Sequence, residues 1–119
     1  MAINAKITKP HINVFYHKGS IIAESFNHVI WGIEEEGIPY AIEGKQEETA
    51  LELAYLGAES SNLGVGIGIG NDGLLILHYN KLQKDHPLFR IKLKDSAETL
   101  RKIGANAARL VKGIPFKAI

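Results

Sequence analysis

LGVGIGIGNDGLLILH, residues 63–78, contains two apolar runs separated by a strong turn signal. Asn71, Asp72 and Gly73 favour a tight turn, so residues 63–69 and 74–78 are predicted to pair as an antiparallel hairpin. In the first run glycine alternates with Val and Ile, and glycine in a strand permits the close approach of a neighbouring element. The sequence therefore predicts a sheet in which this strand lies directly beneath a helix or a partner.

The glycines of residues 64–70 do not predict a nucleotide site. Gly66, Gly68 and Gly70 have the spacing G-x-G-x-G, whereas a dinucleotide-binding loop needs G-x-G-x-x-G followed by a helix. Here a hairpin follows, so no helix N-terminus is available to hold a phosphate.

The flanking patterns predict three more strands and three helices. Apolar and β-branched runs favour strands at residues 12–16, 38–42 and 88–93. A first helix has its apolar face at Ile22, Phe26, Val29, Ile30 and Ile33, with Gly37 after its end. A second follows Glu47 and Glu48 and has an apolar stripe at Leu51, Ala54, Tyr55 and Ala58. A third begins with an Asp95/Glu98 capping box, stops near Gly113 and faces inward with Leu100, Ile103, Ala107 and Leu110.

This βαβαβββα order predicts an α/β fold, a three-layer sandwich with a mixed five-stranded sheet. The strands joined by helices should be parallel, because crossover helices connect parallel strands. The length of 119 residues fits a single domain over residues 1–119, large enough to bury one core.

Composition excludes several classes of protein. The formal net charge of +1 is far from the basic balance of a nucleic-acid binder, and no apolar run approaches the roughly 20 residues of a membrane span. Cysteine is absent, which excludes disulfides and thiolate chemistry. Because the first residues also lack a signal-peptide pattern, we expect a cytoplasmic protein with neither nucleic acid nor membrane as a partner.

Catalytic residues are not predicted. The five histidines, at positions 11, 17, 28, 78 and 86, lack the spacing that places two zinc ligands on one face. No G-x-S-x-G elbow occurs, and His78 beside Tyr79 is interpreted as a packed or surface residue rather than a general base.

The first predicted helix carries an unusual outward stripe. At 100° per residue, four residues of this stripe, between positions 24 and 35, fall within about 60° of one another and lie opposite the apolar face. A solvated polar face rarely contains Trp, which is enriched in interface hot spots. The stripe therefore predicts a contact surface, or alternatively a Trp that lies beneath the N-terminal arm. Its residues are Glu24, His28, Trp31 and Glu35.

Three carboxylates end this helix. Glu34, Glu35 and Glu36 oppose the dipole at a helix C-terminus, so a cation or a basic group should compensate them. A hard divalent ion that accepts one carboxylate from this chain is compatible with that requirement.

Residues from Val29 to Phe116 carry a family resemblance. GIEEEGIPY (32–40), HYNKL (78–82), PLF (87–89) and especially GANAARLVKGIPF (104–116) resemble the small subunit of the diol or glycerol dehydratase-reactivating factor. VGIGI (65–69) and IGANAAR (103–109) also resemble the medium subunit of the cobalamin-dependent dehydratase itself, which is the alternative. The short segment before the first strand and the VKGIPF ending favour the reactivating factor.

The resemblance implies a fold like that of an anticodon-binding domain and a non-catalytic, chaperone-type subunit. It would pair with a large, actin-like ATPase subunit in a heterotetramer, in the cytoplasm or in association with a bacterial microcompartment. That complex would release damaged cobalamin from inactivated dehydratase, with the small subunit leaving as the dehydratase medium subunit takes its place. The client is either glycerol or propanediol dehydratase.

The resemblance also implies a metal ligand. A Glu of GIEEEG would reach Mg²⁺ at the subunit interface, held mainly by the large subunit, with no cofactor bound by this chain alone. Matching motif to motif places this ligand at Glu35, with Glu34 as a substitute.

Overall fold

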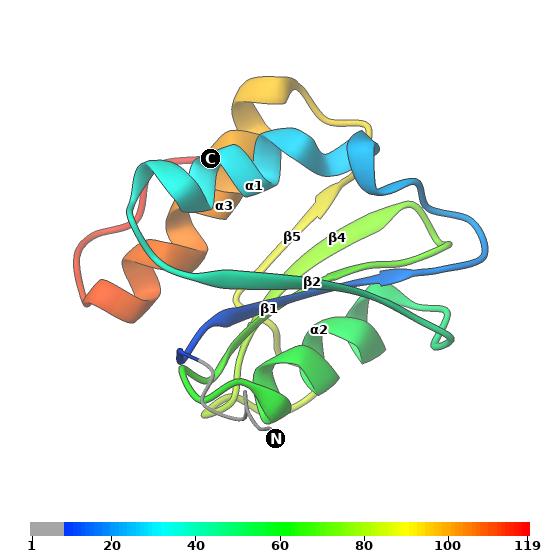
Figure 1. Cartoon of the computed structure of the whole chain (residues 1–119), viewed down its shortest axis with the longest axis horizontal. Helices are drawn as coiled ribbons and strands as arrows, with labels where there is room; N and C mark the ends of the chain where they lie inside the picture. The colour runs from blue at the N-terminus through cyan, green and yellow to red at the C-terminus, as the bar shows by residue number, and fades with distance from the viewer. Residues whose placement is uncertain (1–8) are drawn as a thin grey trace, which may run out of the picture.

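The computed structural model describes residues 9–119 as a five-stranded sheet with helices on both faces (Figure 1). The elements, in chain order, are β1 (Ile12–His17), a 3-10 helix η1 (Ala23–Phe26), α1 (Asn27–Glu35), β2 (Tyr40–Lys45), α2 (Ala50–Ser60), β3 (Val65–Ile69), β4 (Leu74–Tyr79), β5 (Phe89–Lys92) and α3 (Ala97–Lys112).

The sheet is mixed, as the sequence predicts. Its strand order is β2-β1-β3-β4-β5, with β1 parallel to both β2 and β3 and the β3–β4 and β4–β5 pairs antiparallel. Figure 1 shows α1 and α3 together above the sheet and α2 beneath it, which gives the expected three layers. The main core lies between the sheet and the α1/α3 layer. No helix within residues 9–119 is long and apolar enough to cross a membrane.

The glycines of β3 make room for α2, which confirms the role predicted for them. A Cβ on Gly66 would lie 2.3 Å from the Ala58 nitrogen, and one on Gly68 would lie 2.2 Å from the Ala50 carbonyl oxygen. Any side chain at these positions would overlap the helix backbone, so α2 can rest on β3 only because the strand has no side chains on that face.

A second pair of glycines sets the crossing of α1 and α3. A Cβ on Gly32 would lie 2.0 Å from the Arg101 carbonyl oxygen, and one on Gly104 would lie 2.0 Å from the Val29 carbonyl oxygen. The two helix backbones therefore touch, each at the other's glycine. This contact fixes which α3 side chains stand beside the outward face of α1.

The first helix differs from its prediction. Residues 23–26 form a 3-10 turn with a tighter pitch, and the α-helix begins only at Asn27. Ile22, predicted on the buried face, precedes the helix and is 70% exposed. The end is as predicted, because Gly37 adopts a left-handed φ of 78° just after the helix.

Other boundaries also move. The second strand spans Tyr40–Lys45 rather than residues 38–42, and the second helix is capped by Thr49 and buries Leu53 and Gly57 in addition to the predicted Ala54 and Ala58. Leu51 and Tyr55 are only half-buried.

The start of the third helix is also corrected. Its N-cap is Ser96, which accepts from the Thr99 amide, whereas Asp95 accepts from the Lys92 amide in the preceding turn. The Asp95/Glu98 capping box is therefore wrong, and Gly113 ends the helix as predicted, with φ 71°.

Candidate functional site

Trp31 points away from the core, as the helical spacing predicts. Its side chain is 42% exposed. The His28 ring meets it edge-on at 4.8 Å between centroids, and the Arg101 guanidinium lies 5.9 Å from its centroid. The indole is thus held between α1 and α3 with much of its surface free, an arrangement suited to contact with another molecule.

Glu35 lies on the same outward face and pairs with the same arginine. Arg101 Nε is 3.5 Å from Glu35 Oε2, and both side chains are nearly half exposed. An exposed pair at this distance contributes little to stability. The carboxylate of Glu35 is therefore paired with Arg101 but remains accessible.

Glu36 turns toward α3, where its charge is neutralised. Its carboxylate accepts from Lys112 Nζ at 2.7 Å and from Arg109 Nε at 3.1 Å, and its side chain is 11% exposed. The hydrogen bond from Lys112, with further help from Arg109, lowers the pKa of Glu36 against the opposing effect of burial. This carboxylate is committed to holding α1 against α3.

Glu34 makes a different contact. It accepts a hydrogen bond from the Tyr40 hydroxyl at 2.5 Å, and this bond is the main cause of a raised pKa of Tyr40. Glu34 stays exposed and faces the start of β2 rather than the Trp31 surface.

The compensation expected for these three carboxylates comes in part from within the chain. Arg101, Arg109 and Lys112 of α3 supply the positive charge beside Glu35 and Glu36. The sequence pattern did not single out these three residues, although their spacing of eight and then three residues places them near one face of a helix.

The remaining members of the predicted stripe are less closely grouped. His28 is half-buried against Trp31, and Glu24 is exposed on the 3-10 turn, where 3.0 residues per turn change its angular position relative to α1. The alternative in which the N-terminal arm covers Trp31 concerns residues outside those that the structure describes.

Within residues 9–119, no group of three or more His, Asp or Glu side chains is arranged to hold a metal ion. Glu35 offers one accessible carboxylate, and hard divalent ions take six or more oxygen ligands, water included. The described residues therefore do not complete a metal site by themselves, and Glu35 could supply one ligand to a metal completed by other groups.

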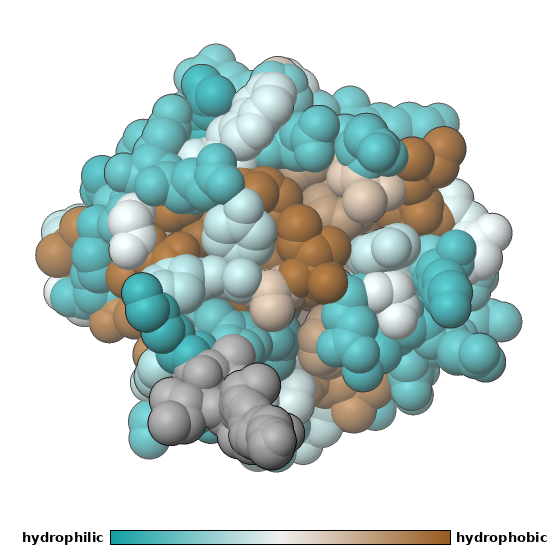
Figure 2. Space-filling view, viewed as in Figure 1, coloured by the Kyte–Doolittle hydropathy of each residue, from teal (hydrophilic) through white to brown (hydrophobic). Residues whose placement is uncertain are grey.

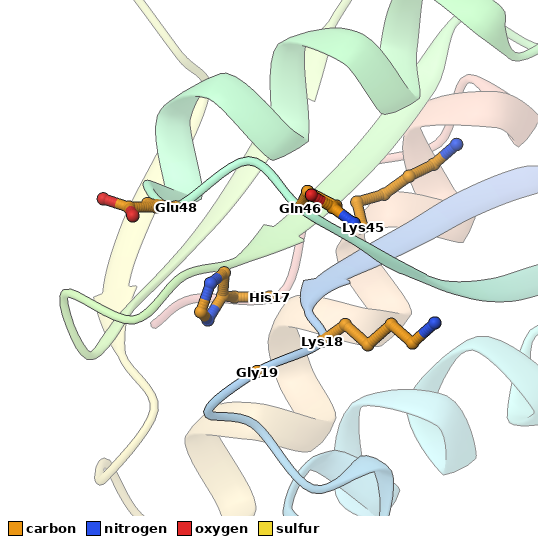
Figure 3. A pocket seen from close by; sticks show the side chains of 6 residues that line it. All are labelled: His17, Lys18, Gly19, Lys45, Gln46 and Glu48. Carbon is orange, nitrogen blue, oxygen red and sulfur yellow. The ribbon is translucent and has the colours of Figure 1, made fainter.

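A crevice of about 400 Å³ lies at the carboxyl ends of the parallel strands β1 and β2. The charged side chains that line this crevice do not point toward a common centre. Lys45 Nζ lies over the Phe15 ring, whereas Lys18 lies beside Gly44 and Tyr16 on the opposite face of the sheet. Figure 3 shows both lysine side chains extending away from Glu48. This arrangement does not define an anion site. The crevice is lined by His17, Lys18, Gly19, Lys45, Gln46 and Glu48.

His78 is buried and fully hydrogen-bonded. Its Nδ1 accepts from the Tyr79 amide at 2.9 Å, so Nε2 carries the proton and donates to the Lys84 carbonyl oxygen at 2.9 Å. Both ring nitrogens serve to hold the connection between β4 and β5, in agreement with the packed role predicted for this residue.

Apolar side chains are also exposed beyond α1. Figure 2 shows them gathered across the middle of the molecule, between α1 and the β2 edge. Ile42 on β2 is 41% exposed. Exposed apolar surface of this kind is common where another protein binds.

Comparison with known proteins places this geometry in a family. Residues 9–117 match the family model described as dehydratase medium subunit. The chain is 39% identical over 115 residues to the propanediol dehydratase-reactivating factor small subunit of Citrobacter freundii, covering 97% of both chains. It is 40% identical over 95 residues to the corresponding Salmonella typhimurium protein, covering 80% of this chain and 81% of that one.

Solved structures agree. A diol dehydratase-reactivating factor complexed with ADP and Mg²⁺ contains a chain that matches with a TM-score of 0.85 and 36% identity, covering 93% of this chain and all of that one. A chain of a glycerol dehydratase reactivase matches with a TM-score of 0.87 and 36% identity, covering 92% of this chain and 97% of that one. The chain therefore belongs to the dehydratase medium subunit family, among the small subunits of diol and glycerol dehydratase-reactivating factors.

Proposed function

We propose that this chain is the non-catalytic small subunit of a factor that reactivates diol or glycerol dehydratase. The observation that carries the proposal is the match over 97% of both chains to a reactivating-factor small subunit. The absence of a predicted catalytic group in the sequence agrees with a subunit that acts by binding. ATP hydrolysis then belongs to a large partner subunit, and this chain supplies an exchangeable surface.

The outward face of α1 is the proposed contact with the large subunit. Trp31 combines a large exposed ring with a fixed position against His28 and Arg101. Trp and Arg are both enriched among the residues that dominate binding energy at protein interfaces.

Glu35 is the proposed ligand of a Mg²⁺ ion shared with that partner. Glu36 is unsuitable because Lys112 and Arg109 already hold its carboxylate, and Glu34, bonded to Tyr40, remains the substitute. The related reactivating factor is complexed with Mg²⁺, which supports a metal in the assembly. When bound, the ion would neutralise carboxylates that meet across the interface.

Reactivation is the direct test. Inactivated diol or glycerol dehydratase is incubated with ATP, Mg²⁺ and free cobalamin together with this chain, a reactivating-factor large subunit, or both. Recovery of dehydratase activity is expected only with both subunits, because neither the ATPase nor the exchangeable surface suffices alone. Full recovery with the large subunit alone would contradict the proposal.

The metal assignment has its own test. Glu35→Gln keeps the shape of the side chain but removes its charge, so Mg²⁺ should strengthen the wild-type complex with the large subunit more than the variant complex. The affinity of each is measured by isothermal titration calorimetry across a Mg²⁺ series. Glu34→Gln is the matched control, and equal Mg²⁺ dependence of wild type and Glu35→Gln would move the role to Glu34 or remove it.

The second candidate is a dehydratase medium subunit, because residues 9–117 match the model of the family that carries that name. It is tested by adding this chain to the large and small subunits of a dehydratase with cobalamin. We expect no dehydratase activity. Activity in that mixture would favour the second candidate over the first.

A further inference from the structure

Arg101 has a fixed place beside the two exposed residues of α1 that carry the proposed interface. The Gly32 Cα touches the α3 backbone at Arg101, since an added Cβ would lie 2.0 Å from the Arg101 carbonyl oxygen. Gly32 lies between Trp31 and Glu35 in the chain. The side chain of Arg101 leaves α3 at this contact and reaches both, with its guanidinium 5.9 Å from the indole centroid and its Nε 3.5 Å from Glu35 Oε2.

The Arg101–Glu35 pair differs from the neighbouring ion pairs in how easily it can be broken. Its side chains are 44% and 47% exposed, and one contact joins them. Glu36 instead accepts from two cationic side chains and is 11% exposed. An exposed pair of the first kind is worth only about 0.2–1 kcal/mol, so it can be exchanged at low cost.

A divalent cation and a guanidinium compete for the same carboxylate. Each is attracted to Glu35, but the two positive charges repel each other, and the repulsion grows as an interface closes and excludes water. Arg101 has a second site of attraction in the Trp31 ring, where a guanidinium gains from the π face. It can therefore release Glu35 without leaving the surface.

We infer that Arg101 is the resident counter-ion of Glu35 in the free chain and that a divalent cation displaces it as the subunits assemble. This inference rests on the proposed function. It makes Arg101 a positioning residue of the interface: its guanidinium sets how much Mg²⁺ the assembly requires.

Arg101→Met tests the inference because methionine keeps an apolar stem on Trp31 without a charge. Affinity for the large subunit is measured by calorimetry across a Mg²⁺ series. The Mg²⁺ concentration that gives half of the maximal increase in affinity should fall by about two- to fivefold, since an exposed pair of up to about 1 kcal/mol corresponds to that factor. Arg101→Gln should give the same result and serves if the methionine variant does not fold.

Two controls separate the ion pair from the general electrostatic field. Lys102→Met removes the positive charge that follows Arg101 in the chain. Because Lys102 pairs with Glu98 and not with Glu35, the Mg²⁺ midpoint of this variant should equal that of wild type. Arg101→Lys keeps the charge and should stay within twofold of wild type.

The outcomes distinguish this inference from the proposal beneath it. An unchanged or raised Mg²⁺ midpoint in both uncharged Arg101 variants overturns the counter-ion role while leaving the Glu35 assignment in place. A Glu35→Gln variant with the Mg²⁺ dependence of wild type overturns the metal assignment and the counter-ion role together.

Discussion

Glu34, Glu35 and Glu36 are adjacent in the chain yet have three different environments. One bonds a tyrosine hydroxyl, one meets an exposed arginine, and one is held by two basic side chains. The helical angle predicts their directions, with Glu35 outward and Glu36 toward the core. It could not predict their partners, because the residues that bond Glu36 lie 73 and 76 positions further along the chain.

Glu36→Gln is expected to destabilise the chain at neutral pH by about 1–3 kcal/mol, because it removes two charge-assisted hydrogen bonds to a mostly buried group. Chemical denaturation of both proteins at pH 7 measures the difference. Glu98→Gln is the control, since it breaks only an exposed pair with Lys102 and should cost a few tenths of a kcal/mol. Equal losses in the two variants would contradict the structural role of Glu36.

The unfolding free energies of wild type and Glu36→Gln should respond differently to acid. The pKa of Glu36 is lowered in the folded chain, so its stabilising effect is complete above the ordinary carboxyl value of 4.5 and is lost as the pH falls through the lower folded value. The free energy of unfolding of wild type should thus converge on that of Glu36→Gln in this acidic window. A gap that stays constant down to pH 3 would rule out the carboxylate as its source.

Trp31→Ala should separate binding from folding. The indole is 42% exposed, so the loss in unfolding free energy should stay below about 1 kcal/mol. The binding free energy with the large subunit should weaken by about 2 kcal/mol or more if the ring is a main contact of the interface. Thermal unfolding and calorimetric titration give the two quantities, and an unchanged affinity or a collapsed melting temperature would each refute the assignment.

At the scale of elements, the turn, the helix ends and the strand glycines predict well, whereas the Asp95/Glu98 capping box and the contacts between helices do not follow from the sequence. The Asn71–Gly73 turn, the antiparallel hairpin and the end of the third helix at Gly113 follow from short-range chemistry, and the structure confirms them. The 3-10 turn and the crossing of α1 with α3 depend on distant contacts. Gly32 and Gly104 could not be identified as contact points from the sequence, because a glycine within a helical pattern does not show which element packs against it.

Gly104→Ala should be far more damaging than its helix propensity suggests. Alanine favours a helix over glycine by up to about 1 kcal/mol, yet its Cβ would lie 2.0 Å from the Val29 carbonyl oxygen. The helices must separate, and overpacking of this kind costs about 1–3 kcal/mol or more. Thermal unfolding should therefore show a lower Tm for Gly104→Ala.

Gly37→Ala is the comparison for Gly104→Ala, because nothing lies within 4 Å of its added Cβ and only its φ of 78° opposes substitution. Its cost should be about 1–2 kcal/mol. A Gly104→Ala protein as stable as wild type would contradict the close helix contact.

At the scale of the whole molecule, the layered α/β architecture was predictable from element order, and the family from motif resemblance. The hydrophobic pattern indicates the fold class, and the helical spacing of Trp31 predicts an outward contact surface. The ion pairs on that surface could not be predicted, because only the folded chain brings α1 and α3 together.

Subunit exchange is a prediction at this scale. If this chain and the dehydratase medium subunit present similar surfaces to a common large subunit, they compete for it by mass action. Mixing preassembled reactivating factor with cobalamin-loaded dehydratase and ADP should release this chain as a free species in size-exclusion chromatography. A complex that gains the dehydratase yet retains this chain at full stoichiometry would contradict the exchange.

The position of β1 between β2 and β3 has a consequence for the order of folding. β3 and β4 each pair with the strand that follows in the chain, whereas β1 meets its two neighbours, β2 and β3, only after α1 and then α2 have been traversed. Closing those longer loops costs more conformational entropy before any strand contact can compensate for it. Pulse-labelled hydrogen exchange during refolding should therefore protect the amides of β3 and β4 before those of β1 and β2. Earlier protection of β1 would mean that this strand, which has a neighbour on each side in the sheet, belongs to the folding nucleus.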